Sequence, residues 1–160
     1  MKNVRIEEIF KRQIYDLENK SREPISLSVL TDSLSDFADE YFRGAFEITR
    51  DFDSSELVRI SPEGLAHFLK LLLGGIYGKG KLMLKISLSF PYAVFKISGC
   101  DLSFVGEGHI RLAEQSGFSL RKADPEQLII TADVIKSASL FVYAISSEEL
   151  TRRIMQVFFG

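Results

Sequence analysis

The strongest constraint on the fold is the segment 81–98, KLMLKISLSFPYAVFKIS, in which apolar and polar residues alternate one by one. Alternation with a period of two places one set of side chains on one face of an extended strand. The alternating apolar residues of its first half are Leu82, Leu84, Ile86, Leu88 and Phe90. Because Pro91 and Tyr92 form a turn and AVFKIS follows, we predict an antiparallel hairpin.

Apolar residues at spacings of three and four predict helices on both sides of this hairpin. The predicted helices cover 3–20, a segment from Ser26 or Ser28 to Gly44, 61–75, 109–115 and a last segment from Ser146. Ser61 can cap the third helix, Pro62 suits its first turn and Glu63 faces the positive end of the helix dipole. Ser146 and Glu149 form a capping-box pattern at the start of the last helix.

Further strands are predicted at 45–52, 118–122, 128–134 and 139–145, with a short apolar segment at 57–60. Helices therefore interleave with neighbouring antiparallel strands along the chain. This order favours a two-layer α+β sandwich and argues against a doubly wound parallel sheet.

Composition limits the class of protein. The chain has 160 residues, 46% of them apolar, which is enough for one domain with a substantial core. A net charge of −2 with cations spread along the chain argues against nucleic acid or anionic lipid as the main partner. The single cysteine, Cys100, excludes an internal disulfide. The start is not a signal peptide and the longest apolar run, 71–77, is too short to span a bilayer, so we predict a soluble, cytoplasmic protein.

The segment LLLGGIYGKGK at 71–81 has the glycines and lysine of a phosphate-binding loop. A Walker-type loop needs G-x-x-x-x-G-K-[ST] between a strand and a helix. Here the stretch from Gly74 to Lys79 is one residue short, Gly80 stands where a hydroxyl residue belongs, and the loop follows a helix. The Walker interpretation is therefore excluded.

A series of segments resembles the ATP-binding domain of sensor histidine kinases, which has the GHKL (Bergerat) ATPase fold. In order, the segments are ISLSVL, FEITRDF, SPEGL, LLLGGIYG, the hairpin, GCDLSF, GEGHIRLAEQSGFSL and LIITADV, over about two thirds of the chain. The resemblance lies in their order, spacing and apolar pattern. It implies a sandwich with a mixed, mostly antiparallel sheet and helices on one face.

The resemblance also implies a division of the chain. Residues 26–160 would form the ATPase-like domain with an extra strand and helix at its C-terminal end. Residues 1–25 would be an N-terminal helix that acts as a remnant linker or as a dimerisation element. The apolar stripe available for a homodimer is Ile6, Ile9, Phe10, Ile14 and Leu17.

The family's nucleotide cleft maps onto Gly75, Lys79, Gly99, Asp101, Gly106 and Gly108. The family's magnesium-binding asparagine falls on Gly75, and a second asparagine of that helix turn falls on Leu71; neither side chain has an oxygen for magnesium. The aspartate that binds the adenine amino group falls on Gly99, with Asp101 two residues on. The lid is only a few residues long, from Phe104 to His109, and Gly106 and Gly108 are a weak remnant of the family's glycines.

Three functions follow from these departures. The first is a degenerate domain, not an enzyme and without a cofactor, that regulates two-component signalling by contact with a response regulator or with a histidine-bearing kinase or phosphotransferase chain. The second is a working site for ATP and magnesium, in which Asp101, Lys79 and the backbone at 106–108 replace the lost groups. The third is a structural domain with an unrelated small ligand in the cleft.

The remaining polar residues are interpreted as structural. Residues 1–66 contain no histidine, so the first helix cannot carry the phosphoacceptor of the usual kinase arrangement. His67 is predicted as a partly exposed helix residue and His109 as a solvated residue near a helix start. The acids of the second helix form a predicted solvated face; they are Asp32, Asp36, Asp39 and Glu40.

Overall fold

A computed structural model describes residues 22–53, 56–76, 80–135 and 144–160. Its elements are β1 (Glu23–Ser26), α2 (Leu27–Tyr41), β2 (Phe46–Asp51), β3 (Leu57–Ile60), α3 (Pro62–Ile76), β4 (Gly80–Ser89), β5 (Tyr92–Cys100), α4 (Glu107–Gln115), β6 (Ser119–Asp124), β7 (Gln127–Asp133) and α5 (Ser147–Phe159). The predicted helix at 3–20, with its possible dimer stripe, and Lys79 lie outside the described residues.

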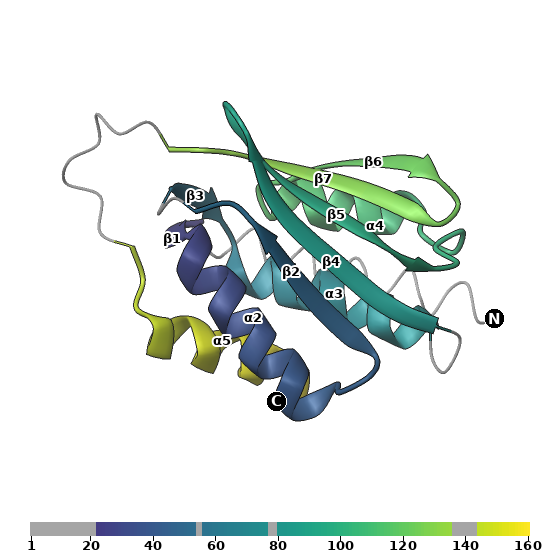
Figure 1. The fold of residues 1–160 in the computed structure, drawn as a ribbon, viewed down its shortest axis with the longest axis horizontal. Coiled ribbons are helices and arrows are strands. Elements are labelled where there is room, and N and C mark those ends of the chain that lie inside the picture. Colours follow the sequence, from purple (N-terminus) through teal and green to yellow (C-terminus); the bar gives the residue numbers. More distant parts are fainter. Residues whose placement is uncertain (1–21, 54–55, 77–79, 136–143) are drawn as a thin grey trace.

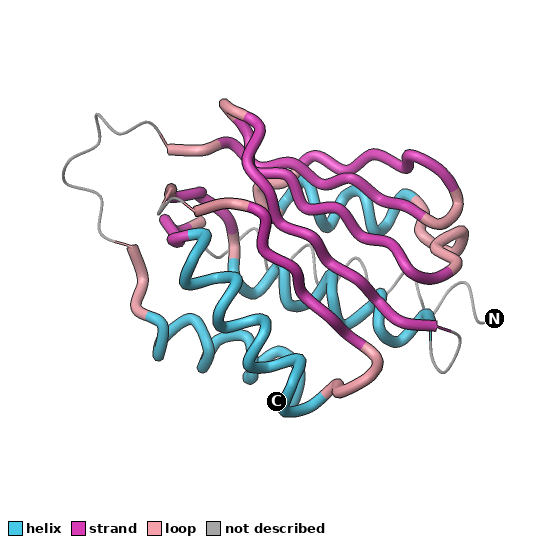
Figure 2. Tube along the Cα trace, viewed as in Figure 1, coloured by secondary structure: helices cyan, strands magenta, loops and turns pink. Residues whose placement is uncertain are grey.

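The main sheet has five strands in the order β2-β4-β5-β7-β6 (Figure 1). β2 runs parallel to β4, because α3 crosses over between them, and every other neighbouring pair is antiparallel. β1 and β3 form a separate two-stranded antiparallel sheet. The helices gather on one side of the main sheet (Figure 2). The predicted α+β sandwich with a mixed, mostly antiparallel sheet is confirmed.

The alternation in 81–98 produces the predicted hairpin of β4 and β5. Leu82, Leu84 and Ile86 are at most 2% exposed on the inner face of β4, whereas Met83 and Lys85 lie on the outer face. α2 packs on β2, α3 on β4 and α4 on β6, so the core lies between these helices and the inner face. The sheet is thus covered on one side by the described helices.

The predicted serine caps are present, whereas the Glu149 side chain of the predicted capping box pairs with Arg152. Ser26 Oγ accepts a hydrogen bond from the Val29 N–H (3.4 Å), and Ser61 Oγ accepts one from the Gly64 N–H (3.1 Å). Ser146 Oγ accepts one from the Glu149 N–H (3.1 Å). Each cap satisfies a backbone donor that has no partner within the first turn of its helix.

Helix α5 packs on α2 and α3, away from the main sheet (Figure 1). Leu150 and Ile154 are buried in that contact. At its end, Phe158 lies 4.7 Å from Phe37 of α2 between ring centroids, and Phe159 lies 4.8 Å from Tyr41. α5 therefore adds a further helix to the outside of the helical layer.

The structure differs from the sequence predictions in two segments, 139–145 and β1. The predicted strand at 139–145 lies mostly outside the described residues, and its last two residues, Ala144 and Ile145, are not in a strand. β1 was not predicted, because Pro24 marks the segment as a helix stop. No helix in the described part of the chain is both long and apolar enough to cross a bilayer.

Candidate functional site

Three segments meet at the C-terminal end of α3. They are the last turn of α3, the loop that follows β5, and the start of α4. The ring of Phe104, from the loop, lies directly against Gly75: a Cβ atom built on Gly75 would be 2.3 Å from Phe104 Cε2. Non-bonded carbons do not approach so closely, so any other residue at position 75 would have to displace the ring.

His109 also packs against the Phe104 ring. Its ring centroid is 5.8 Å from that of Phe104 and 6.4 Å from that of Phe68, in edge-to-face geometry in both cases. Its Nδ1 accepts a hydrogen bond from the Gly106 N–H (3.1 Å). Only 8% of His109 is exposed, so its interpretation as a solvated residue was wrong. We refer to Phe68, Gly75, Phe104 and His109 together as the aromatic plug.

Burial sets the protonation state of His109. The apolar surroundings lower its pKa from the usual 6.5 to about 4, and the charge of Lys122 contributes in the same direction. The imidazole is therefore neutral near pH 7. A neutral ring whose Nδ1 is already an acceptor is held in one tautomer, which suits a packing role.

Gly99 occupies a backbone position that excludes a side chain. Its φ is +95°, and a Cβ there would lie 2.3 Å from the carbonyl oxygen of Lys81. The close approach accompanies a register shift between Gly80 and Met83 in the β4–β5 ladder. Glycine is thus required by the local geometry of the hairpin end.

Asp101 and Cys100 follow Gly99 at the end of β5. Asp101 is exposed, and its Oδ1 accepts a hydrogen bond from the Ser103 N–H (3.0 Å), which shapes the loop as an Asx turn. Cys100 is buried, and burial together with the neighbouring charge of Asp101 raises the pKa of its thiol. A thiol with a raised pKa is a poor nucleophile at neutral pH.

The last two predicted site residues begin α4. Gly106 is the N-cap residue, with an extended backbone and no neighbour within 4 Å of a built Cβ, and Gly108 lies in the first turn. The structure therefore places Phe104 against Gly75 and beside His109, while Asp101 and Gly106 flank Phe104 along the chain. Phe104 entered the sequence analysis only as the boundary of a short lid.

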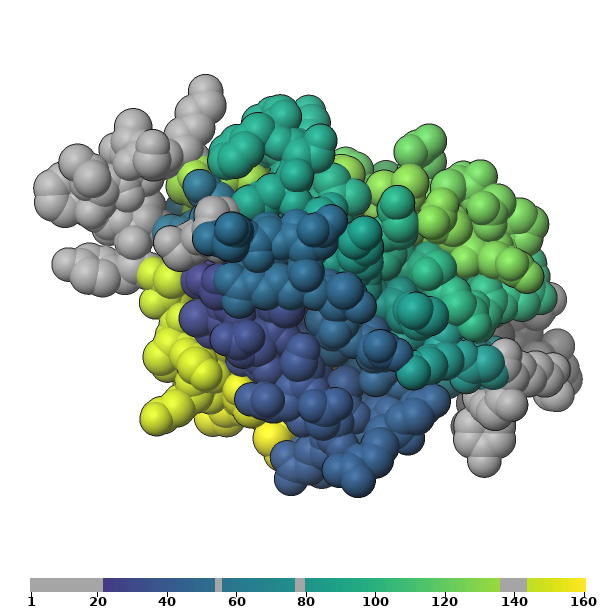
Figure 3. Space-filling model, viewed as in Figure 1, coloured from purple at the N-terminus to yellow at the C-terminus, as the bar shows by residue number. Residues whose placement is uncertain are grey.

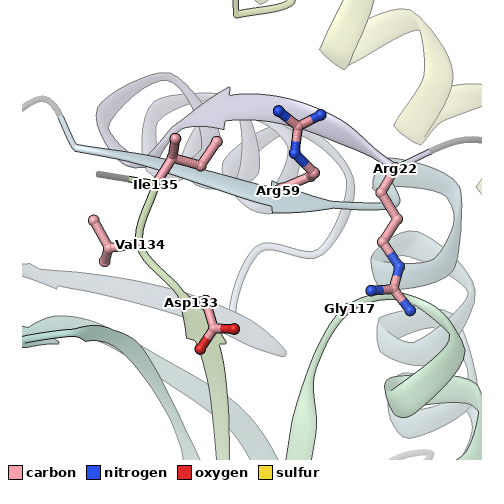
Figure 4. A pocket seen from close by; sticks show the side chains of 6 residues that line it. All are labelled: Arg22, Arg59, Gly117, Asp133, Val134 and Ile135. Atoms are coloured by element: carbon pink, nitrogen blue, oxygen red, sulfur yellow. The ribbon is translucent and has the colours of Figure 1, made fainter. Parts of the chain in front are cut away.

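Metal-binding side chains do not gather in this region. Among the described residues no group of three or more histidines, cysteines, aspartates or glutamates is arranged to hold an ion. A pocket of about 280 Å³ lies at the other end of the sheet, near the start of α3 (Figure 4). It is lined by Arg22, Arg59, Gly117, Asp133, Val134 and Ile135. Arg22 and Asp133 stand on opposite sides of it, and Arg22 Nη2 donates to the carbonyl oxygen of Glu114 (3.2 Å).

Comparison with known proteins identifies the fold. No protein-family model matches the sequence, and no curated protein matches it significantly. The histidine kinase AdeS of Acinetobacter baumannii superposes with a TM-score of 0.54 and 12% identity, over 79% of this chain and 76% of AdeS. The ATP-binding domain of PrrB from Mycobacterium tuberculosis gives 0.50 and 15%, over 73% of this chain and 100% of that domain.

A third solved structure is the histidine kinase ThkA in complex with the response regulator protein TrrA. It gives a TM-score of 0.56 and 10% identity, over 86% of this chain and 50% of the matched chain. Similarity at these identities establishes the fold and leaves activity open. The chain has the fold of the ATP-binding domain of histidine kinases.

Proposed function

We propose that this chain is a degenerate histidine kinase-like ATPase domain that carries out no ATP chemistry and acts in two-component-type signalling through protein contacts. The observation that carries the proposal is the ring of Phe104 against Gly75, with 2.3 Å between Cε2 and a built Cβ. Position 75 is where the resemblance places the magnesium-binding asparagine. In this chain the position has no side chain, and a side chain added there would have to displace the Phe104 ring.

The region does not fit magnesium. Magnesium requires hard oxygen ligands in near-octahedral geometry. Gly75 and Leu71, at the family's two asparagine positions, offer no side-chain oxygen, and an aromatic ring covers the first of them. Phosphoryl transfer depends on neutralising the phosphate charge with such a metal, so loss of the ligands removes the central requirement for catalysis.

The region does not fit adenine in the family's manner either. Gly99, at the position of the adenine-binding aspartate, is confined by the Lys81 carbonyl to a glycine. Asp101 is the nearest carboxylate along the chain, and one of its oxygens already shapes its own loop. These two observations support a cleft that retains its scaffold and has lost its nucleotide contacts.

The proposed partner is a response regulator or a histidine-bearing kinase or phosphotransferase chain in the cytoplasm. The support is the shared fold with ThkA, which was solved in complex with the response regulator TrrA. A domain without ATP chemistry can act in such a system by occupying or positioning a partner. Such a domain needs a surface that binds the partner, and it does not need a catalytic residue.

Isothermal titration of ATP and of ADP with magnesium tests the absence of nucleotide binding. We expect no heat of binding at nucleotide concentrations up to about 1 mM, a limit that corresponds to roughly −4 kcal/mol of binding free energy. Micromolar binding that Asp101→Ala abolishes and Asp36→Ala leaves intact would overturn the proposal. It would establish instead an atypical ATP-binding domain. Asp36 is a suitable control because it is an exposed acid on α2.

The regulatory part of the proposal needs a separate measurement. The chain is added to a phosphorylated histidine kinase and its receiver protein from the same organism, and the rate of phosphoryl transfer is followed. We expect the rate to change with the concentration of the chain and in the same way with or without added nucleotide. A rate that depends on nucleotide bound to this chain contradicts the proposal.

A further inference from the structure

The outer face of the main sheet has no described element over it. Figure 3 views this face and shows β2, β4 and β7 on the surface toward the reader. Lys85 of β4 is directly opposite Lys96 of β5, Lys96 is opposite Ile129 of β7, and Ile129 is opposite Arg121 of β6. We call Lys85, Lys96, Ile129 and Arg121 the cationic row. It crosses four neighbouring strands and contains no acid.

The cationic row is electrostatically unfavourable in the isolated chain. Like charges directly opposite each other on one face of an antiparallel pair destabilise the sheet. Lys85 has some compensation, since its Nζ lies 3.5 Å from Asp51 Oδ2 at the edge strand. Lys96 and Arg121 are exposed and make no ion pair within the described part of the chain. One uncompensated cation, Lys96, therefore lies on the central strand β5, and the other, Arg121, lies on the edge strand β6.

The surroundings of the row suit contact with a flat surface. Partly exposed apolar side chains lie within and beside it: Met83 is 41% exposed, and Val94 and Ile129 are half-buried. The neighbouring outward positions carry four small hydroxyl side chains, and Met83 and the 45%-exposed ring of Tyr92 stand beside them on the same face. These hydroxyl residues are Ser87, Ser98, Ser119 and Thr131. Exposed methionine and tyrosine side chains beside an arginine are residue types that are enriched at protein-binding surfaces.

We propose that the cationic row is a docking surface for an acidic, helical surface of a protein partner. The inference rests on the proposed function, because it names the chemistry of the partner through which a domain without ATP chemistry would act. A helix with acids at spacings of three and four presents carboxylates in a line, which matches a line of cations across strands about 4.8 Å apart. Binding would supply the counter-charges that Lys96 and Arg121 lack.

The charges around the row favour a protein over a nucleic acid. Acids flank it on the sheet: Glu47 and Asp51 on β2 and Asp133 at the end of β7. A long polyanion that crosses the face would run past these carboxylates, whereas a compact acidic surface would not. Single strands also need a series of aromatic platforms for their bases, and the described strands carry one on this face, Tyr92 of β5.

Titration of the ¹⁵N-labelled chain tests the docking surface. The probe is a short, blocked, alanine-rich helical peptide with glutamates along one face, and the matched peptide has lysines in their place. We expect the acidic peptide alone to shift amide resonances of β4, β5 and β6, with weaker shifts at high salt. An oligothymidine that binds more tightly than the acidic peptide would overturn the choice of partner.

Charge-reversal variants identify the residues. In Lys96→Glu/Arg121→Glu we expect the acidic peptide to bind at least about tenfold more weakly, because two attractive charge contacts are replaced by repulsive ones. The control Arg43→Glu/Arg111→Glu changes the net charge equally at exposed residues off this face. Equal weakening in both variants, or no binding of the acidic peptide to the wild type, overturns the proposal. Neither result bears on nucleotide titration, so the two proposals fail independently.

Discussion

At the scale of single residues, the aromatic plug shows how one position constrains another. Gly74 and Gly75 are adjacent in the last turn of α3, and both are exposed. A Cβ on Gly74 would meet no atom within 4 Å, whereas a Cβ on Gly75 would collide with Phe104. The two glycines are alike in sequence, and the tertiary contact alone distinguishes them.

Gly75→Ala is expected to destabilise the fold by about 1–2 kcal/mol, because the new methyl group displaces the Phe104 ring. Gly74→Ala is the matched control and is expected to be neutral or stabilising by up to about 1 kcal/mol through helix propensity. Urea unfolding of both variants measures the difference. In a Phe104→Ala background the cost of Gly75→Ala should fall toward that of Gly74→Ala; an undiminished cost would show that the ring is not the obstacle.

His109 is expected to make stability depend on pH below neutrality. Its pKa of about 4 in the folded chain lies below the usual 6.5, so the unfolded chain binds more protons between these values. Stability from this residue is complete above about pH 6.5 and falls as the pH drops toward 4, by roughly 3 kcal/mol in total. Urea unfolding between pH 7.5 and 4.5 measures it.

His109→Asn is the control for this prediction. Asparagine keeps an acceptor for the Gly106 N–H and does not titrate, while every carboxylate of the chain is unchanged. We expect a shallower loss of stability between pH 6.5 and 4.5 in the variant than in the wild type. If the free energy of unfolding fell equally with pH in the two proteins, the pH dependence would be due to the carboxylates.

At the scale of elements, α5 is joined to the domain by ion pairs as well as by apolar packing. Arg153 Nε lies 2.5 Å from Glu63 Oε1 and its Nη2 lies 2.8 Å from Glu63 Oε2, a bidentate pair with the first turn of α3. Arg153 Nη1 also donates to Glu23 of β1. Both members of the bidentate pair are largely buried, with 13% and 10% of their side chains exposed. One arginine thus connects α5, α3 and β1.

Arg153→Met is expected to cost about 3–5 kcal/mol in the free energy of unfolding, because it removes the bidentate partner of the largely buried Glu63 carboxylate. Arg152→Met, one residue earlier, removes an exposed pair with Glu149 and should cost less than about 1 kcal/mol. Adding Glu63→Gln to Arg153→Met should recover part of the loss. Urea unfolding of the wild type, the two single variants and the double variant measures these costs. Equal costs for the two arginine substitutions would contradict the ion-pair account.

The elements also show what the sequence could predict. The hairpin, α3 and α5 follow from strong periodicity and from serine caps that act within one turn. β1 was missed because four residues around Pro24 have no period and depend on β3 for their hydrogen bonds. The plug was missed because Phe104 and Gly75 are brought together only by the fold. Local sequence patterns predicted the helices and strands, whereas the contact between Phe104 and Gly75 could be found only from the tertiary structure.

At the scale of the whole molecule, charge is distributed unevenly although the net charge is small. The exposed face of α2 carries acids, which are Asp32, Asp36, Asp39 and Glu40. The outer face of the sheet carries the cationic row. A molecule with a net charge of −2 can therefore attract an acidic surface at one face, because the field close to a surface is set by nearby groups.

Lys96→Thr is expected to stabilise the fold by about 0.2–1 kcal/mol at low salt, because it removes the repulsion from Lys85 directly opposite. The gain should shrink at high salt, where the repulsion is screened. Arg121→Thr is the control, since Arg121 faces Ile129 and no cation. Thermal or urea unfolding at two salt concentrations measures both; a gain that salt leaves unchanged would point to strand propensity instead of charge.

The contact between Phe104 and Gly75 also determines the order in which substitutions at these two positions can accumulate. In a lineage that gained an oxygen-bearing side chain at position 75, that side chain would have to displace the Phe104 ring before it could contact an ion. Phe104 would first have to be replaced by a smaller residue, in a protein where that replacement brings no catalytic benefit. Loss of the side chain at position 75 is therefore easier in evolution than its regain.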